Sequence, residues 1–551
     1  MAEKSSKHTI VSSPGKVLLA GGYLVLDREY SGLVVATSSR FYSSVTSLPY
    51  TSSPQGFGKE EQAIISIRAG QFPKESSEWI YKLSINQEAN ELSLIQINED
   101  EVGKNKFIYI TLFQTIAFIY EKLVKESGKS GLEAAKELIN RAKNDGDGKQ
   151  SNGLQIVVLA DNDFYSQREQ LSALSLPTKI SSLSSLKPFT SLPRPIPQTN
   201  KTGLGSSAAL VTSLVASILS HLNIVSSPSS STPSNSDLSN HQTQIQIQTQ
   251  TQNKDLQIVH SLAQFSHCLA QGKVGSGFDI SSAVFGTHLY KRFSPSILSP
   301  LMDNNSSSSS KSISLASNQN TMKLLDILEP SKWDHKQTKF KLPKGLRLIL
   351  ADVDAGTDTP SFVGKVLSWR KENPEKSKES WNNLDKSNMN LERLLVELAG
   401  KEEQDDYEET LARQSEEIIE DDVSTLLSFI KNNSIASLIY QIRSTLSTIR
   451  EYQREMSELS GVPIEPPEQT RLLDACSKLP GVIGGGVPGA GGYDALFLLI
   501  IDSPSVLSKV DNLWLEWKEM SVCPLLAKQS DGGLRVEDLK SVPGLKEALE
   551  R

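Results

Sequence analysis

The feature that most constrains this chain is a short glycine-containing segment that runs directly into a long apolar one. Residues 201–210 read Lys-Thr-Gly-Leu-Gly-Ser-Ser-Ala-Ala-Leu, and the residues up to 219 are small or apolar with few exceptions. This pattern predicts a flexible loop that leads into the N-terminus of a buried helix at about residues 206–222. Unpaired backbone N–H groups and the positive end of the helix dipole meet at that point, which suits a phosphate. An ordinary capped core helix is the plainer alternative, because Ser-Ser before an apolar run is common.

Two more glycine-containing segments lie near the ends of the chain. Residues 13–27 read Ser-Pro-Gly-Lys-Val-Leu-Leu-Ala-Gly-Gly-Tyr-Leu-Val-Leu-Asp, and residues 484–492 read Gly-Gly-Gly-Val-Pro-Gly-Ala-Gly-Gly. In this order the three segments resemble the motif set of the GHMP small-molecule kinases. Within that superfamily, residues 201–202, 270–279 and 356–365 are most similar to the phosphomevalonate kinases of the eukaryotic type. The resemblance reaches essentially from end to end, apart from low-complexity insertions.

Composition limits what kind of protein the chain can be. A length of 551 residues exceeds one compact core, and a formal net charge of −7 disfavours nucleic-acid binding. The three cysteines are widely spaced and form no CxxC pair. No signal peptide, membrane-spanning apolar run or C-terminal Ser-Lys-Leu signal is visible. We therefore expect a cytoplasmic protein that binds a small molecule and neither nucleic acid nor a membrane; the sequence does not indicate its oligomeric state.

The order of predicted strands and helices favours an α+β chain of two domains. The resemblance implies a two-domain GHMP kinase fold, with an N-terminal domain like domain 2 of ribosomal protein S5 and a ferredoxin-like C-terminal domain. We place the N-terminal, nucleotide-binding domain at residues 1–295, a serine-rich linker region at residues 296–340 and the C-terminal domain at residues 341–551.

Several individual elements are predicted from local patterns. Residues 8–50 predict short strands around turns, and residues 346–352 and 495–501 predict buried strands. The Ser-, Gln- and Thr-rich residues 226–254 cannot bury a core and predict a disordered insertion. A helix is expected to resume at Leu256.

The candidate catalytic residues are Lys16 and Asp279. Without the resemblance, each has a plainer interpretation. A lone lysine such as Lys16 is usually a solvated surface charge, and an aspartate at position 279 suits a helix cap. The resemblance implies that Lys16 neutralises charge on the transferring phosphoryl group and that Asp279 is its active-site partner. A phosphate monoester has a second pKa of about 6, so this acceptor is mostly a dianion near neutral pH. We therefore expect Asp279 to orient Lys16 and the metal or water shell, with base catalysis as a lesser possibility.

The loop after residue 200 carries the expected nucleotide contacts. The residues assigned to ATP are Lys201, Thr202, Gly203, Leu204, Gly205, Ser206, Ser207, Ala208 and Ala209. The glycines let the backbone approach an anion closely. The resemblance also implies Mg²⁺, with Ser207 as the one assigned ligand. Mevalonate-type relatives carry a glutamate for this metal where the present chain has His267, which is a poor ligand for a hard cation and an equally good candidate for helix packing.

The acceptor side is expected to be rich in cations. The residues assigned to the substrate are Tyr23, Lys273, Ser276, Ser361, Lys365 and Arg370. Pro360 suits the first turn of a helix, on which Ser361 and Lys365 share one face. A charged surface helix and, for Tyr23, a core position are the alternatives. Residues 484–492, with Asp494, are expected to form a turn that closes the site and supports the loop of residues 203–207.

The resemblance implies an ATP-dependent phosphotransferase that converts 5-phosphomevalonate to 5-diphosphomevalonate, on the mevalonate route to isoprenoids and sterols. One alternative is a GHMP kinase that acts on an alcohol such as mevalonate or homoserine. His267 and the cation-rich segment around Lys365 count against it. The other alternative is a catalytically silent metabolite sensor of the same fold, against which the presence of Lys16, Ser207 and Asp279 counts.

Overall fold

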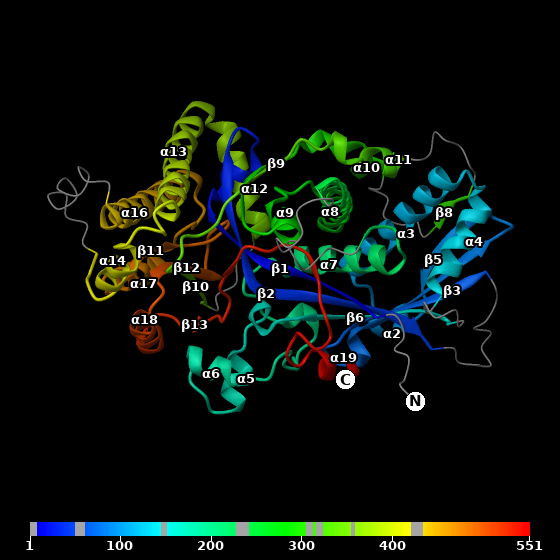
Figure 1. The fold of residues 1–551 in the computed structure, drawn as a ribbon, viewed down its shortest axis with the longest axis horizontal. Coiled ribbons are helices and arrows are strands. Elements are labelled where there is room, and N and C mark those ends of the chain that lie inside the picture. Colours follow the sequence, from blue (N-terminus) through cyan, green and yellow to red (C-terminus); the bar gives the residue numbers. More distant parts are fainter. Residues whose placement is uncertain are drawn as a thin grey trace.

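Two β-sheets organise the fold (Figure 1). The computed structural model describes residues 8–49, 61–144, 151–226, 242–304, 312–315, 323–353, 359–419 and 434–551. Within these residues, eleven strands form the larger sheet and four form the smaller one. The strands of the larger sheet are β1 (Thr9–Ala20), β2 (Ser31–Leu48), β3 (Gln62–Ala69), β4 (Glu78–Asn86), β5 (Glu91–Gln96), β6 (Gly153–Ala160), β7 (His288–Lys291), β8 (Ser312–Ser314), β9 (Lys336–Lys339), β14 (Gln529–Ser530) and β15 (Arg535–Val536).

The larger sheet has the strand order β15-β1-β2-β6-β3-β4-β5-β8, while β14 and β7 also pair with β2, and β9 pairs with β7. Four helices, α3, α7, α8 and α9, cover one face, and α7 packs directly on β1 and β2 (Figure 1). The helices of this half are α1 (Lys74–Ser77), α2 (Glu99–Val102), α3 (Lys106–Ser127), α4 (Gly131–Ala142), α5 (Arg168–Ala173), α6 (Ile180–Ser184), α7 (Ser206–His221), α8 (Gln242–Gln271), α9 (Phe278–Phe285), α10 (Ser299–Asn304) and α11 (Lys323–Ile327).

Helices α7 and α3 are the apolar centre of this half. The structure confirms the predicted helix at 206–222, whose residues from Ala208 on are buried with one exception because they are small or apolar on every side. Residues Lys106–Glu126 of α3 are long and apolar enough to span a membrane, but 72% of the most apolar window is buried among neighbouring elements. Such burial is typical of a core helix.

The strands predicted in residues 8–50 are confirmed, but the expectation that they are short and separated by several turns is wrong. This segment forms two long antiparallel strands, β1 and β2, joined through a 3₁₀ turn at Gly22–Leu26. The pairing register shifts between Pro14 and Lys16, and this irregularity lets the strand continue past the Pro-Gly pair. A side chain at Gly15 would lie 2.7 Å from Thr37 Oγ1 and 3.1 Å from the carbonyl oxygen of Leu204, so only glycine fits there.

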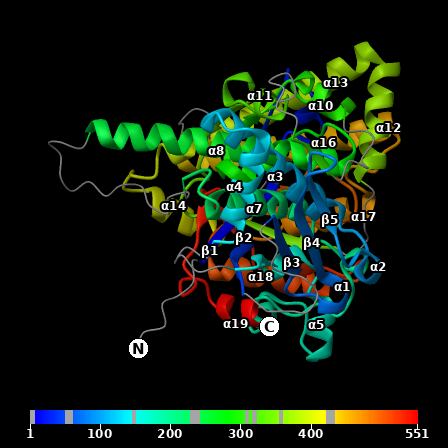
Figure 2. The ribbon, with the colours of Figure 1, turned by 90° about the vertical axis from the view of Figure 1, so that its right-hand side faces the viewer.

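Two predictions about irregular segments also need correction. Residues 296–340 do not serve only as a linker, because β8 pairs with β5 and β9 pairs with β7 in the larger sheet. The disordered insertion predicted at residues 226–254 ends earlier than expected, since α8 begins at Gln242 and not at Leu256. Glutamine is a good helix former, and each residue added to an existing helix gains one hydrogen bond. Figure 2 shows this part of α8 extending away from the rest of the molecule; residues 227–241 and the serine run lie outside the described residues.

The smaller sheet is antiparallel, with the order β11-β12-β10-β13. The predicted strands at 346–352 and 495–501 are confirmed as β10 and β12. Alternate residues of β12 face opposite sides, as a strand requires: Leu496, Leu498 and Ile500 pack with α17 and α18, and their neighbours belong to the core that includes α13 and α16. The strands of the smaller sheet are β10 (Leu346–Asp352), β11 (Val482–Gly486), β12 (Ala495–Ile501) and β13 (Cys523–Pro524). The helices of this half are α12 (Thr359–Glu372), α13 (Pro374–Ala399), α14 (Tyr407–Gln414), α16 (Ile435–Ser460), α17 (Pro467–Ser477) and α18 (Pro504–Glu516).

Residues 529–551 return to the larger sheet, although they were predicted within the C-terminal domain. β14 pairs with β2, β15 pairs with β1, and α19 (Leu545–Glu550) packs on the face opposite α7. Arg40 of β2 holds the C-terminal segment against the larger sheet. Its buried guanidinium donates to the carbonyl oxygens of Ser12 in β1 at 2.9 Å and of Gly533 in the C-terminal segment at 2.5 Å. The sheet that carries β1 is therefore completed by both ends of the described chain.

Candidate active site

The loop before α7 has the backbone that its glycines predict. Gly203 and Gly205 adopt φ values of +78° and +79°, a left-handed conformation that other residues reach only at a cost. Gly205 is the residue before the first turn of α7, so the free N–H groups of that turn open toward the loop. The N–H of Lys16 donates to the carbonyl oxygen of Leu204 at 2.9 Å, which fixes the loop against β1.

Lys16 extends from β1 along this loop. Its Nζ donates to the carbonyl oxygen of Gly203 at 2.7 Å and lies 5.6 Å from the centre of the Phe278 ring. Burial lowers the pKa of Lys16, while the negative charge of Asp279 opposes that shift. The lysine therefore lies between the glycine loop and the start of α9.

Asp279 is the second residue of α9, and this helix begins directly after Gly277, which has a φ of +84°. Its Oδ1 accepts from the backbone N–H of Ile280 at 2.9 Å, and its carboxylate is 21% exposed. Its Oδ2 lies 3.9 Å from Nδ1 of His267. The structure thus brings the predicted catalytic residues, Lys16 and Asp279, to the same place as the loop.

His267 on α8 is the centre of this group. Its buried ring places Nε2 3.1 Å from Ser207 Oγ, on the first turn of α7, while Nδ1 faces Asp279. Burial lowers the pKa of His267, and the charge of Asp279 acts in the opposite direction. His267 is therefore more than a helix packing residue, which was the alternative, because it contacts two predicted site residues. The available sequence signal was its position, one helical turn before the 270–279 motif.

A pocket adjoins the loop on the side of α3. Among the apolar residues that line it are Phe72, Phe107 and Leu210, and the polar end is formed by Lys201, Ser206 and Ser207. Burial lowers the pKa of Lys201. Sequence reasoning missed the apolar lining, since it comes from short stretches scattered between residues 41 and 210.

The turn predicted at residues 484–492 is shorter than expected, because Gly484–Gly486 pair with β12 as part of β11, and residues 487–492 form the turn that lies against the N-terminal half. Tyr23 is buried and donates its hydroxyl to the carbonyl oxygen of Ala490 at 2.7 Å, in accord with the core alternative for this residue. A side chain at Gly203 would lie 4.0 Å from Ala495, directly after the turn. Gly489, Gly491 and Gly492 all have positive φ, which explains why the turn contains several glycines. Asp494 contributes its carbonyl oxygen to Val353 N–H at 3.1 Å.

A cluster of charged side chains around the buried Glu465 lies next to this turn. The carboxylate of Glu465 is fully buried and accepts from Arg450 at 2.8 and 3.0 Å and from Arg454 at 2.9 Å. The neighbouring Ile464 accepts from the N–H of Gly492 at 2.8 Å. The turn is therefore hydrogen-bonded to the residue that precedes this buried carboxylate.

The residues assigned to the acceptor are arranged less closely. Ser361 is partly buried on the first turn of α12, while Lys365 and Lys273 are exposed. Ser276 accepts from the hydroxyl of Tyr290 through its carbonyl oxygen at 2.8 Å. Of residues 356–365, the segment that resembles the phosphomevalonate kinases, residues 356–358 lie outside the described residues.

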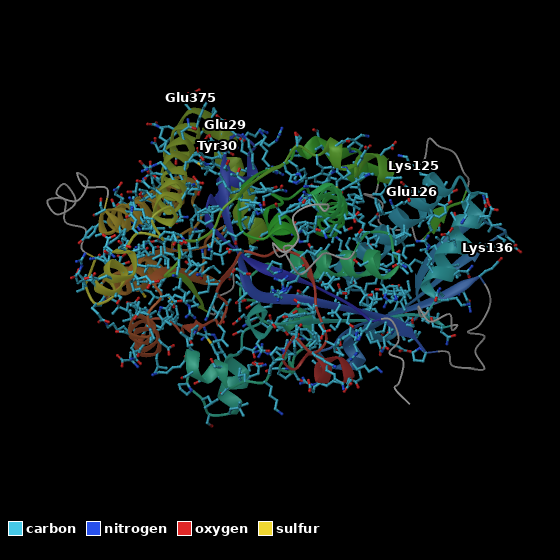
Figure 3. All side chains as sticks on the ribbon, in the orientation of Figure 1. Glu29, Tyr30, Lys125, Glu126, Lys136 and Glu375 are labelled. Atoms are coloured by element: carbon cyan, nitrogen blue, oxygen red, sulfur yellow. The ribbon has the colours of Figure 1, made fainter. Side chains whose placement is uncertain are left out.

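Arg370 does not offer a free cation. Its guanidinium forms an ion pair with Asp27 and stacks 4.0 Å from the centre of the Trp381 ring. Tyr30, which Figure 3 labels beside Glu29, donates to Asn382 on the same helix at 2.9 Å. These contacts give Arg370 a structural role where the β1–β2 connection meets α13.

Comparisons with known proteins show the family to which the chain belongs. The family description "GHMP kinases C terminal" matches residues 436–516. A protein of Arabidopsis thaliana named phosphomevalonate kinase, peroxisomal, is 35% identical over 541 residues, covering 96% of each chain. A phosphomevalonate kinase of Aspergillus fumigatus is 34% identical over 532 residues, covering 93% of this chain and 90% of its own.

Solved structures show the same fold. A protein of Listeria innocua has a TM-score of 0.54 at 13% identity, covering 97% of this chain and all of its own. The phosphomevalonate kinase of Streptococcus pneumoniae in complex with phosphomevalonate and AMPPNP has a TM-score of 0.50 at 13% identity, covering 95% of this chain and 99% of its own. With its full-length relatives and its α+β GHMP kinase fold, the chain belongs to the phosphomevalonate kinase family.

Proposed function

We propose that this chain transfers the γ-phosphoryl group of ATP to 5-phosphomevalonate, giving ADP and 5-diphosphomevalonate for isoprenoid and sterol synthesis. The observation that carries the proposal is the grouping of Lys16, Ser207 and Asp279 beside the glycine loop. It occurs in a chain whose relatives over nearly the full length are named phosphomevalonate kinases.

The nucleotide is assigned to the loop and the pocket beside it. The triphosphate would lie on residues 203–207, where backbone N–H groups at the start of α7 are free to donate. The adenine base would enter the apolar pocket, with Phe72 and Phe107 among its walls and Lys201 at the polar end. This assignment is supported by the pairing of one polar and one apolar region in a single site.

The residues at the start of α7 and α9 fit a magnesium ion. Ser207 offers a hydroxyl oxygen and Asp279 a partly exposed carboxylate, and both are the hard oxygen donors that Mg²⁺ prefers. The nitrogen of His267 does not suit this cation, and the ring is already engaged by both residues. When bound, the metal would neutralise charge on the nucleotide phosphates.

The chemistry required of the protein is mainly electrostatic. Both reactants are polyanions, so the largest barrier is their repulsion. Lys16 is fixed by the loop at the place where this charge gathers. Asp279 counters the effect of burial on the pKa of Lys16 and thereby favours its charged form. Because the acceptor phosphate is largely ionised near neutral pH, Asp279 serves chiefly to orient and charge its neighbours.

The acceptor side is assigned to Ser361, Lys365, Lys273 and Ser276. Ser361 and Lys365 lie on the first turns of α12, and the other two lie in the connection between α8 and α9. Exposed lysines on both segments could hold the phosphate end of the acceptor. Tyr23 would act indirectly, through the turn at Ala490.

An acceptor panel tests the proposed function. ADP formation would be measured with phosphomevalonate, mevalonate, homoserine or no acceptor, each with and without Mg²⁺. Of the three acceptors, we expect only phosphomevalonate to support ADP formation. We also expect this reaction to require Mg²⁺. Turnover on mevalonate but not on phosphomevalonate would favour the alcohol kinase, and no turnover with any acceptor would favour the sensor.

The cytoplasmic location stays a prediction, and the Arabidopsis relative carries the word peroxisomal in its name.

A further inference from the structure

His267 has three polar neighbours and a nearly closed environment. Its side chain is 3% exposed, and its ring lies 5.8 Å from that of Phe107. Nε2 is 3.1 Å from Ser207 Oγ and 3.4 Å from Gln271 Nε2, while Nδ1 is 3.9 Å from Asp279 Oδ2. The amide nitrogen of Gln271 can only donate, so the ring nitrogen that it approaches must keep its lone pair, and one ring nitrogen therefore carries a hydrogen while the other is an acceptor.

Two neighbours select the same tautomer. The carboxylate of Asp279 only accepts, and although 3.9 Å is too long for a hydrogen bond, its charge favours the N–H on Nδ1. The amide nitrogen of Gln271 only donates, and it approaches Nε2. Both contacts therefore leave the hydrogen on Nδ1 and the lone pair on Nε2.

The tautomer fixes the direction of the Ser207 hydroxyl. If Nε2 accepts, Ser207 must donate its only hydroxyl hydrogen to the ring. We infer that His267 is a positioning residue that holds the Ser207 hydroxyl hydrogen away from the nucleotide, so that the lone pairs of Ser207 Oγ face a divalent cation. Ser207 is then an acceptor toward the site and does not donate to a phosphate oxygen. The inference rests on the proposed function, because it needs a nucleotide and its metal beside α7.

This arrangement explains how a histidine occupies a place where related kinases have an acid. A glutamate contributes a ligand oxygen directly. His267 contributes none, and acts by setting the polarity of an oxygen that its neighbour supplies. Groups that orient metal ligands in this way typically change metal affinity or activity by about 10–100-fold when they are removed.

The matched pair His267→Gln and His267→Asn separates the two ring nitrogens. The longer glutamine amide can place its oxygen where Nε2 lies and still accept from Ser207, whereas asparagine reaches only the Nδ1 position. The measured quantity is the Kd of ATP with Mg²⁺ and with EDTA. For wild-type protein and His267→Gln, we expect Mg²⁺ to tighten ATP binding equally. For His267→Asn, we expect about tenfold or more of that gain to be lost, with the Kd of metal-free ATP unchanged.

A double-mutant cycle shows whether His267 acts through Ser207. Ser207→Ala should lose the same metal-dependent gain, and adding His267→Asn to it should cause no further loss. Additive losses, or a full metal-dependent gain in His267→Asn, would overturn the inference.

The tautomer can be read directly in the wild-type protein. Long-range ¹H–¹⁵N spectra of ¹⁵N-histidine-labelled enzyme, with the His267 signals identified by their absence in His267→Gln, should show the hydrogen on Nδ1. A hydrogen on Nε2 would refute the inference even if the asparagine variant failed to fold. This outcome is distinct from failure of the proposed function, which would appear as wild-type enzyme that does not use phosphomevalonate in the acceptor panel.

Discussion

Replacing Gly205 by alanine should displace Lys16, the proposed catalytic lysine, without removing it. At the φ of +79° observed here, the new Cβ would lie 3.0 Å from Lys16 Cε and 3.2 Å from Lys16 Cγ. Carbon atoms prefer separations of about 3.5–4.0 Å, so the lysine stem must move by about 0.5–1 Å. That movement would break the 2.7 Å contact between Lys16 Nζ and the carbonyl oxygen of Gly203.

Two effects contribute, and two control variants separate them. An alanine in the left-handed region costs about 1–2 kcal/mol of stability. Misplacing a catalytic group by about 1 Å can cost up to about 100-fold in rate. Gly128→Ala tests strain alone, because Gly128 has a φ of +60° at the end of α3 and no atom lies within 4 Å of the new Cβ. Gly203→Ala has the same strain in the same loop, and its nearest new neighbour is the Ala495 Cβ at 4.0 Å.

Urea unfolding and steady-state kinetics provide the readouts. All three variants should lose about 1–2 kcal/mol of unfolding free energy. The kcat of Gly205→Ala should fall by about 10–100-fold, and that of Gly203→Ala should fall by less. The reasoning is refuted if Gly205→Ala keeps the kcat of Gly128→Ala, since the position of Lys16 would then not matter.

Three further predictions concern stability and the closing turn. Glu465→Gln leaves the buried Arg450 with only the half-exposed Asp474 as counter-charge and removes the carboxylate from the partly exposed Arg454, so urea unfolding should show a loss of up to about 3 kcal/mol; a loss below about 1 kcal/mol would show that the ion cluster is dispensable. Tyr23→Phe removes the hydrogen bond to Ala490, so stability should fall by about 1 kcal/mol and amide exchange at residues 489–492 should accelerate; unchanged exchange would mean that Tyr23 does not hold the turn. Burial lowers the pKa of His288 and of His335 to about 4, below the ordinary 6.5, so the unfolded chain binds these protons first. Unfolding free energy should therefore be fully present above about pH 6.5 and fall by up to about 1.4 kcal/mol per pH unit per histidine down to about pH 4; an equal slope after substitution of both histidines would contradict this assignment.

Local patterns were enough to locate the elements that carry the site. The glycine loop, α7 and strand β12 are confirmed because each depends on a short run of residues with one clear physical requirement. Positive φ demands Gly203 and Gly205, and burial on both faces demands the apolar run of β12. Lys16 and Asp279 are brought together because they adjoin such segments.

The remaining features depend on contacts between distant residues. Strands of two residues, such as β14 and β15, leave no periodic pattern, so their return to the first sheet could not be read from the sequence. The role of His267 depends on the first turns of α7 and α9 meeting at one ring. Likewise, the ion pair that occupies Arg370 comes from Asp27, over three hundred positions away.

The return of residues 529–551 has a consequence for biosynthesis. On the ribosome, β1 and β2 emerge first, yet their partners β14 and β15 emerge only when almost the whole chain has been made. Until residues 533–537 arrive, Arg40 would lack both the carbonyl oxygen of Gly533 and its counter-charge, the carboxylate of Glu537 at 3.5 Å. The strand that bears Lys16 is therefore expected to mature after translation ends, and nascent chains halted before residue 529 should depend on chaperones while lacking nucleotide affinity.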